Sequence, residues 1–190
     1  FRTEPLIRAL IEDAKVRKSS HDFGKDIIPR LVRRSGVFAF LFDGYWEDIG
    51  TLDAYWAANM AFLSDAPPFV PDEASWRIRT YRPQVGPSYI QTSDIRNSII
   101  ASGCSIRGGS VVNSVLSPGV KIGAGARVED SIIFEGAAIG PGARVRRAII
   151  DKFAAIPARF AVGFSPAKDR RNFLISPEGI RVIPKYWSQE

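Results

Sequence analysis

The chain has 190 residues, of which 45% are hydrophobic and 24% are charged, and its formal net charge is +6 at pH 7. This length allows one or two domains with a substantial apolar core. The basic residues are scattered or form short pairs, without aromatic interleaving or a recognition helix, so nucleic-acid binding is not expected, although the charge suits phosphate-bearing ligands. No apolar run approaches membrane-spanning length and no signal peptide is present, which favours a cytoplasmic protein without a membrane segment.

Residues 1–64 are predicted to form the C-terminal part of an α/β domain, in the order helix, loop, helix, strand, loop, helix. The first helix begins at Thr3-Glu-Pro5, because a capping hydroxyl, an acid and a proline are typical of a helix start. Asp26 is expected to cap the second helix, and Thr51 begins the third. The continuous apolar run over residues 37–42 predicts a strand that is covered on both faces.

Each of these helices carries an apolar face at helical spacing, and the face of the second helix is expected to point inward. The three faces are Leu6, Ile7, Leu10, Ile11 and Ala14; then Ile27, Ile28, Leu31 and Val32; and then Leu52, Tyr55, Trp56, Asn59, Met60 and Leu63. Residues 65–94 follow as a predicted linker. They contain five prolines with Trp76 and Tyr81 between them, which indicates an ordered linker rather than a flexible tether.

The region after the linker repeats itself. Four units begin Asn97-Ser-Ile-Ile, Asn113-Ser-Val-Leu, Asp130-Ser-Ile-Ile and Arg147-Ala-Ile-Ile, at spacings of 16, 17 and 17 residues. Fixed self-similarity of this kind is typical of a stacked repeat architecture. Within each unit aliphatic residues recur six apart, at Ile100, Ile106 and Val112; Leu116, Ile122 and Val128; Ile133, Ile139 and Val145; and Ile150, Ile156 and Val162.

A period of six in threes predicts a triangular coil, in which each hexad is one short strand plus a corner and the aliphatic residues point to the axis. The narrow interior also explains small residues at Cys104, Val120, Ala137 and Ala154, so the single cysteine is expected to be part of the core. A β-sandwich would instead show period two. We therefore expect a hexapeptide β-helix over residues 95–163, with residues 164–190 forming two short strands around Ser176-Pro-Glu-Gly179 that cap the coil.

Two stretches of the first 64 residues could carry chemistry. The loop over residues 20–26 mixes His21 with carboxylates, a lysine and a glycine, and on chemistry alone it reads as a helix-capping loop. Trp46 and Asp48 would share one face if their segment is extended, which gives an aromatic wall beside a carboxylate, as sugars favour. The alternative is that Asp48 is a turn residue and that Trp46 belongs to the core.

The motifs together resemble a known family. They are Ser19-Ser-His-Asp-Phe-Gly-Lys-Asp-Ile-Ile-Pro29, Tyr45-Trp-Glu-Asp-Ile-Gly-Thr-Leu-Asp-Ala-Tyr-Trp-Ala-Ala-Asn59, Trp76-Arg-Ile-Arg-Thr-Tyr81 and Ser176-Pro-Glu-Gly-Ile180. From Phe1 to Lys185 the chain resembles the C-terminal portion of the ADP-glucose pyrophosphorylase (glucose-1-phosphate adenylyltransferase) family. The resemblance implies a left-handed β-helix preceded by the C-terminal part of a nucleotidyltransferase domain, with glucose 1-phosphate and ATP as substrates.

The same resemblance implies roles for individual positions. Asp22, Phe23 and Trp46 would line the glucose 1-phosphate pocket, and Asp48 would be a catalytic residue as one of two aspartates that hold Mg²⁺. Lys152 and Lys185 fall where the family can place contacts to an anionic allosteric effector, although they read equally well as solvated surface lysines. The family also implies a homo-oligomer, expected to be a tetramer, that serves glycogen or starch synthesis.

Some parts of the family pattern are missing from this sequence. Three features are not found: the glycine-rich nucleotide loop, the second metal aspartate and the sugar-phosphate lysine. The chain also opens at Phe1 and has Met60 as its one methionine. We therefore expect a fragment that is inactive alone. Three alternatives stay open: another sugar-phosphate nucleotidyltransferase, a non-catalytic regulatory subunit, and a hexapeptide acyltransferase. The last is disfavoured because the one histidine, His21, lies far upstream of the repeats.

Overall fold

The computed structural model describes residues 1–34, 36–70, 75, 78, 80–81 and 83–188. The chain divides into two compact units, Phe1–Gly44 and Tyr45–Glu190, and each is described by itself. The predicted division at residues 64 and 94 stays a prediction. Trp76, on which the ordered linker was partly argued, lies outside the described residues. Every helix in the described part of the chain is too short or too polar to cross a lipid bilayer.

The first unit contains α1 (Thr3–Ala14), the π-helical turn η1 (Phe23–Ile27) and α2 (Ile28–Arg33). The helix starts differ from the predicted ones. Arg2 is the N-cap of α1 and makes no side-chain cap bond, so the Thr3 hydroxyl is not the cap. Asp22 rather than Asp26 caps η1, because its carboxylate is the one that accepts the Lys25 N–H.

The apolar faces of the first unit are mostly exposed. Ala9 and Ile27 are buried and Leu31 is half-buried, but Ile11 is 53% exposed and Val32 is 55% exposed. The predicted inward face of the second helix is therefore wrong at Ile28 and Val32. Residues 37–42 form no strand, and Phe38 is 91% exposed. The predicted strand is wrong because a strand covered on both faces needs paired neighbours, and no described residue pairs with this segment.

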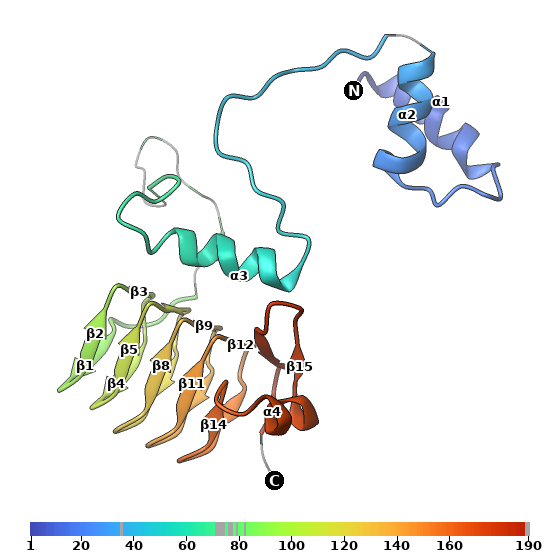
Figure 1. The fold of residues 1–190 in the computed structure, drawn as a ribbon. Coiled ribbons are helices and arrows are strands. Elements are labelled where there is room, and N and C mark those ends of the chain that lie inside the picture. Colours follow the sequence, from blue (N-terminus) through green and yellow to red (C-terminus); the bar gives the residue numbers. More distant parts are fainter. Residues whose placement is uncertain (35, 71–74, 76–77, 79, 82, 189–190) are drawn as a thin grey trace. The chain divides into compact units, whose positions relative to one another are not determined.

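The second unit begins with an extended lead into α3 (Leu52–Ala61). Thr51 caps this helix as predicted, since its hydroxyl accepts the Ala54 N–H at 3.1 Å. Tyr55, Trp56 and Met60 on the predicted face pack against a cluster of buried isoleucines, Ile132, Ile149 and Ile180. The helix therefore lies against the coil (Figure 1).

Short strands stack into a β-helix, as predicted, and among the described residues they form three sheets whose neighbours are parallel except β15 and β16. The sheet orders are β1-β4-β7-β10-β13, β14-β11-β8-β5-β2 and β15-β16-β12-β9-β6-β3. The strands are β1 (Tyr89–Gln91), β2 (Asp94–Arg96), β3 (Ile99–Ile100), β4 (Ser105–Arg107), β5 (Ser110–Val112), β6 (Val115–Leu116), β7 (Lys121–Ile122), β8 (Arg127–Glu129), β9 (Ile132–Ile133), β10 (Ala138–Ile139), β11 (Arg144–Arg146), β12 (Ala148–Ile150), β13 (Ala155–Ile156), β14 (Ala161–Val162), β15 (Leu174–Ile175) and β16 (Arg181–Ile183).

The interior of the coil is filled by the aliphatic residues of the repeat. Ten of the twelve predicted inward positions are buried, and Ile100 packs against them. The prediction that Val112 points inward is wrong. Val111 is the buried residue, because it aligns with Val128 in the next coil while Val112 aligns with Glu129. The repeat that begins at Asn97 has 16 residues, one fewer than the next two repeats. The missing residue falls at the corner between β4 and β5. Cys104 is buried in this core, which raises the pKa of its thiol.

The recurring Asn-Ser pairs form one corner of the coil. Asn97, Asn113 and Asp130 all have positive φ, a conformation that asparagine and aspartate tolerate better than most residues. Their amides bond up the stack, from Asn97 to Asn113 at 2.8 Å and from Asn113 to Asp130 at 3.3 Å. The serines that follow these residues form a second ladder, in which each serine hydroxyl accepts a backbone N–H from the next coil. The Ser131 N–H, for example, donates to the Ser114 hydroxyl at 3.1 Å.

The C-terminal tail packs on the last coil. β15 and β16 form the two strands predicted around the turn that ends at Gly179, and β16 extends the sheet by pairing with β12. Phe160, Phe173 and Trp187 form an aromatic cluster against the core. A short helix, α4 (Pro166–Asn172), leads into this hairpin and lies beside β14 in Figure 1.

Candidate functional site

The loop between α1 and η1 is held by one buried carboxylate. Asp13 is 2% exposed, and its oxygens accept hydrogen bonds from the Ser19 hydroxyl at 2.8 Å and from Arg30 at 2.8 Å. Nδ1 of His21 lies 2.8 Å from the same carboxylate. The hydrogen bond from His21, followed by those from Ser19 and Arg30, lowers the pKa of Asp13 against the opposing effect of burial.

A second carboxylate closes the same loop. Asp26 accepts the Ser20 backbone N–H at 3.1 Å and the Ser20 hydroxyl, and the hydroxyl bond is the main cause that lowers the pKa of Asp26. His21 adopts φ 59°, so the chain turns sharply there. The loop is thus a helix-capping loop with satisfied polar groups, as its chemistry alone predicted.

This loop positions the two predicted sugar-contact residues of the first unit. The Asp22 carboxylate is exposed and accepts the Lys25 N–H at 2.8 Å. Phe23 is 44% exposed, and its ring meets that of Phe1 edge-on with centroids 6.1 Å apart. A carboxylate and an aromatic face therefore stand side by side at the start of η1, with solvent-accessible surface on both.

The other two predicted site residues belong to the second unit. Trp46 is 74% exposed, so it is not a core residue here. One oxygen of Asp48 accepts the Gly50 N–H at 3.0 Å, which fixes the carboxylate in a tight turn just before α3. A Cβ at Gly50 would lie 3.1 Å from that oxygen, so glycine suits this turn. Tyr45 anchors the segment by packing against Phe62 and Phe69.

The carboxylates of the described residues do not form a complete metal centre. No group of three or more His, Cys, Asp or Glu side chains in that part of the chain is arranged to hold a metal ion. Asp48 is exposed and has one oxygen engaged by the Gly50 N–H, so by itself it offers a single carboxylate and not a complete metal site.

Sequence reasoning missed the contacts that join α3 to the β-helix. Asp53 accepts a hydrogen bond from the Ser176 hydroxyl, which in turn accepts the Ile180 N–H at 2.9 Å. Two of the motifs that carried the resemblance are therefore in direct contact. The signal was present as an acid in the first turn of a helix and a serine that opens a turn, but their pairing needs the fold.

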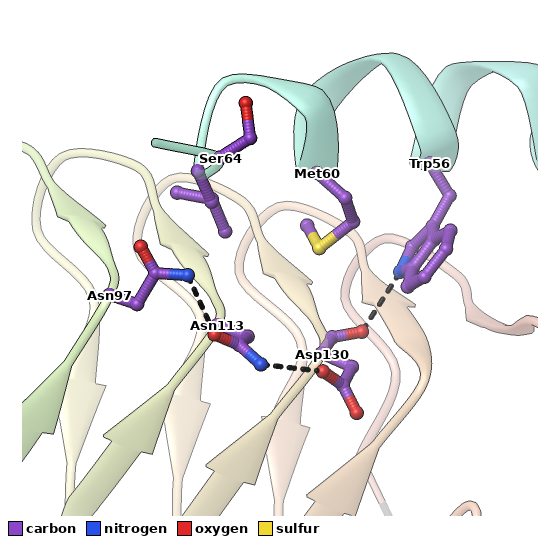
Figure 2. A pocket seen from close by; sticks show the side chains of 7 residues that line it. Trp56, Met60, Ser64, Asn97, Asn113 and Asp130 are labelled. Atoms are coloured by element: carbon purple, nitrogen blue, oxygen red, sulfur yellow. Dashed lines mark hydrogen bonds between the residues drawn. The ribbon is translucent and has the colours of Figure 1, made fainter. Parts of the chain in front are cut away.

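The same helix covers the Asn-Ser corner. Nε1 of Trp56 donates to the backbone oxygen of Asp130 at 2.8 Å, and the guanidinium of Arg147 lies 4.8 Å from the indole centroid. Figure 2 shows Trp56 and Met60 pointing from the helix toward the ladder of Asn97, Asn113 and Asp130. A small cavity of about 230 Å³ lies between them.

Lys152 and Lys185 are brought together at another corner of the coil. The Tyr186 N–H donates to the Lys152 oxygen at 3.1 Å, and the Phe153 and Tyr186 rings stack with centroids 5.5 Å apart. Nζ of Lys185 lies 4.7 Å from the Tyr186 centroid. A Cβ at Gly136 would lie 2.5 Å from the Phe153 ring, so the coil below leaves space for this stack. Both lysines are exposed.

Two family models match the chain, one after the other. Residues 1–65 match the model described as nucleotidyl transferase, and residues 87–183 match the model described as GlmU-like, C-terminal hexapeptide. The order agrees with the two kinds of structure described above, helices first and β-helix second.

The chain is also similar to curated proteins named glucose-1-phosphate adenylyltransferase. The Thermosipho africanus protein is 48% identical over 130 residues, which is 68% of this chain and 31% of that protein. Two proteins named glucose-1-phosphate adenylyltransferase 2 match 97% of this chain, the one from Vibrio cholerae at 40% identity and the one from Vibrio parahaemolyticus at 46%. The chain spans about half the length of these two relatives, 49% and 50% respectively.

Proposed function

Because the chain belongs to the GlmU-like C-terminal hexapeptide family and matches the glucose-1-phosphate adenylyltransferases over about half their length, we propose that it is part of such an enzyme. The reaction would join ATP and glucose 1-phosphate to give ADP-glucose and pyrophosphate. The observation that carries this proposal is the 97% of the chain covered at 40% and 46% identity by two relatives of this name. That coverage includes both the helical segment and the β-helix.

In this proposal the first 64 residues supply the sugar side of the pocket. In the first unit, the exposed Asp22 carboxylate can accept hydrogen bonds from sugar hydroxyls, and the exposed face of Phe23 can stack on a pyranose ring. In the second unit, the exposed indole of Trp46 offers a face of the same kind. Each of these groups would help to orient glucose 1-phosphate so that a phosphate oxygen faces the α-phosphorus of ATP. Holding two reactants in line accounts for much of the rate of such transfers.

Asp48 would contribute one carboxylate oxygen to the Mg²⁺ ion that such enzymes use, and its turn leaves the second oxygen without a hydrogen bond in the described residues. The metal would neutralise the charge that develops on the transferred phosphate. The Gly50 N–H fixes the carboxylate just before α3, which Thr51 caps. Trp56 fixes α3 to the β-helix and Asp53 fixes it to the tail. The β-helix therefore positions a residue of the proposed active site.

The corner that carries Lys152 and Lys185 is proposed as the contact for an anionic effector. Two exposed ammonium groups beside a stacked aromatic pair suit a small metabolite with a phosphate or carboxylate. A homotetramer in the cytoplasm remains part of the proposal.

The test is a substrate panel applied to the enzyme that contains this chain. Pyrophosphate release is measured with ATP, UTP, CTP and GTP against glucose 1-phosphate and N-acetylglucosamine 1-phosphate, and acetyl-CoA consumption is measured in parallel. We expect release only with ATP and glucose 1-phosphate. A preference for another nucleotide or sugar, or acetyl transfer without pyrophosphate release, would contradict the proposal.

A further inference from the structure

A second cavity lies at the C-terminal end of the β-helix, and none of the residues assigned above lines it. It has a volume of about 470 Å³ and opens between α4 and the corner that joins β13 to β14. Its size falls within the range of pockets that bind small metabolites. Its lining residues are Arg159, Phe160, Ala161, Lys168, Asp169, Arg171 and Asn172.

Three of the lining side chains are cationic, and none of them is neutralised locally. Among the described residues, no ion pair or side-chain hydrogen bond engages the charged ends of Arg159, Lys168 or Arg171. All three residues are exposed. Three cations around one cavity repel each other at close range unless an anion lies between them, so their convergence favours an anionic ligand.

The carboxylate in the lining does not cancel this charge. Asp169 is 2% exposed, and one of its oxygens accepts the Arg181 Nε–H at 3.1 Å and the Gly163 N–H at 3.2 Å. That carboxylate is therefore committed to the arginine behind it, and it serves to hold α4 on the tail. The cavity keeps the positive charge of the other three residues.

The backbone at Arg159 carries an independent signal. Arg159 has φ 61° at a corner where the residues stacked beneath it are Gly142, Gly125 and Gly108, all with φ of 67° or 68°. Glycine is the residue that adopts this conformation without strain, so an arginine here costs stability that the three glycines avoid. Arg159 is one of the residues that line the cavity.

The apolar wall of the cavity is rigid. Phe160 packs against Phe173 and Trp187, with centroids 6.4 Å and 5.7 Å away, and these rings belong to the cluster that covers the end of the core. An aromatic face beside cationic groups suits a ligand with a ring attached to a phosphate.

We propose that this cavity binds a small phosphorylated metabolite of sugar-phosphate size, with Arg159, Lys168 and Arg171 contacting the phosphate and Phe160 contacting the ring. Arginine binds phosphate through paired N–H donors, and a lysine adds a point charge. The cavity is separated from Lys152 by the strand β13 and lies at a different corner of the coil. The proposal does not rest on the proposed function, because binding here needs neither ATP nor turnover.

The test measures binding of inorganic phosphate and of glucose 6-phosphate to the 190-residue chain by calorimetry at low ionic strength. We expect glucose 6-phosphate to bind more tightly than inorganic phosphate. Arg159→Gly and Arg171→Gln should each weaken the affinity about tenfold, as loss of a charge-assisted hydrogen bond does. Arg159→Gly installs the residue that the three preceding coils carry at this corner, so the unfolding temperature should not fall, and a loss of affinity would report the guanidinium rather than the fold.

A matched control separates this cavity from general attraction to a basic protein. Arg170→Gln removes the same charge from the same helix outside the lining. This variant should bind both probes within twofold of the unaltered chain. The proposal is overturned if Arg159→Gly and Arg171→Gln bind normally, if Arg170→Gln is weakened as much as they are, or if neither probe binds at millimolar concentration.

Discussion

Asp13 lies on the inner side of α1, where its carboxylate collects hydrogen bonds from Ser19 and Arg30 and lies against the ring of His21. These partners lower the pKa of Asp13 below the ordinary value of 3.8. A carboxyl whose pKa is lowered by folding stabilises the fold while it is ionised, above its unfolded pKa, and this contribution is lost as pH falls through the folded value.

We therefore expect amide hydrogen-exchange protection in α1 and η1 to fall when the pH is lowered below 3.8, and Asp13→Asn to lose protection already at neutral pH. Asp43→Asn changes an exposed carboxylate of the same unit and should have no effect. Protection in Asp13→Asn equal to that of the unaltered chain would show that this carboxylate does not hold the loop.

The same residue shows what sequence patterns leave out. The pattern marked the polar loop and its capping role, but not Asp13, because a carboxylate inside an amphipathic helix is recognised as buried only once Ser19, His21 and Arg30 are seen to converge on it. The motifs single out Asp22 and Asp48 as candidate site residues, and the structure adds which backbone N–H groups fix each carboxylate.

At the scale of the element, one coil of the β-helix departs from the simple period of six. Val111 is fully buried and Val112 faces outward in register with Glu129. Valine and threonine have nearly the same shape, and both suit strands, so a threonine at either position changes only the polarity of the site.

Val111→Thr is expected to lower the free energy of unfolding by about 2 kcal/mol, because a hydroxyl is placed in an apolar interior. Val112→Thr should stay within about 0.5 kcal/mol of the unaltered chain. Urea denaturation followed by circular dichroism measures both. Equal losses in the two variants, or a larger loss at Val112, would contradict the observed register.

The coil itself was predictable because its signal is repeated. Twelve positions at nearly constant spacing outweigh one irregular corner, and a narrow interior restricts Cys104, Val120 and Ala137 to small or modest side chains. The strand prediction for residues 37–42 was wrong because it rested on a single apolar run without any repetition. Hydrophobicity indicates that a stretch can be buried, whereas pairing partners decide whether it forms a strand.

At the scale of the whole molecule, a stacked coil holds the segment that is proposed to contact the sugar and the metal. Trp46 and Asp48 lead into α3, whose Trp56 bonds the Asn-Ser corner and whose Asp53 bonds Ser176 in the tail. The β-helix thus fixes the segment with the proposed metal ligand, in addition to presenting the lysine corner. Long-range contacts of this kind cannot be read from spacing in the sequence.

The measurement that tests this account most directly is ADP-glucose formation by the enzyme that contains this chain, with Asp48→Asn compared with Glu47→Gln. Loss of a group that holds charge in the transition state typically costs about a hundredfold or more in turnover. We expect that loss for Asp48→Asn with unchanged circular dichroism, and turnover within about threefold for Glu47→Gln, a neighbouring exposed carboxylate with no assigned role. Near-normal turnover in a folded Asp48→Asn enzyme would contradict the account.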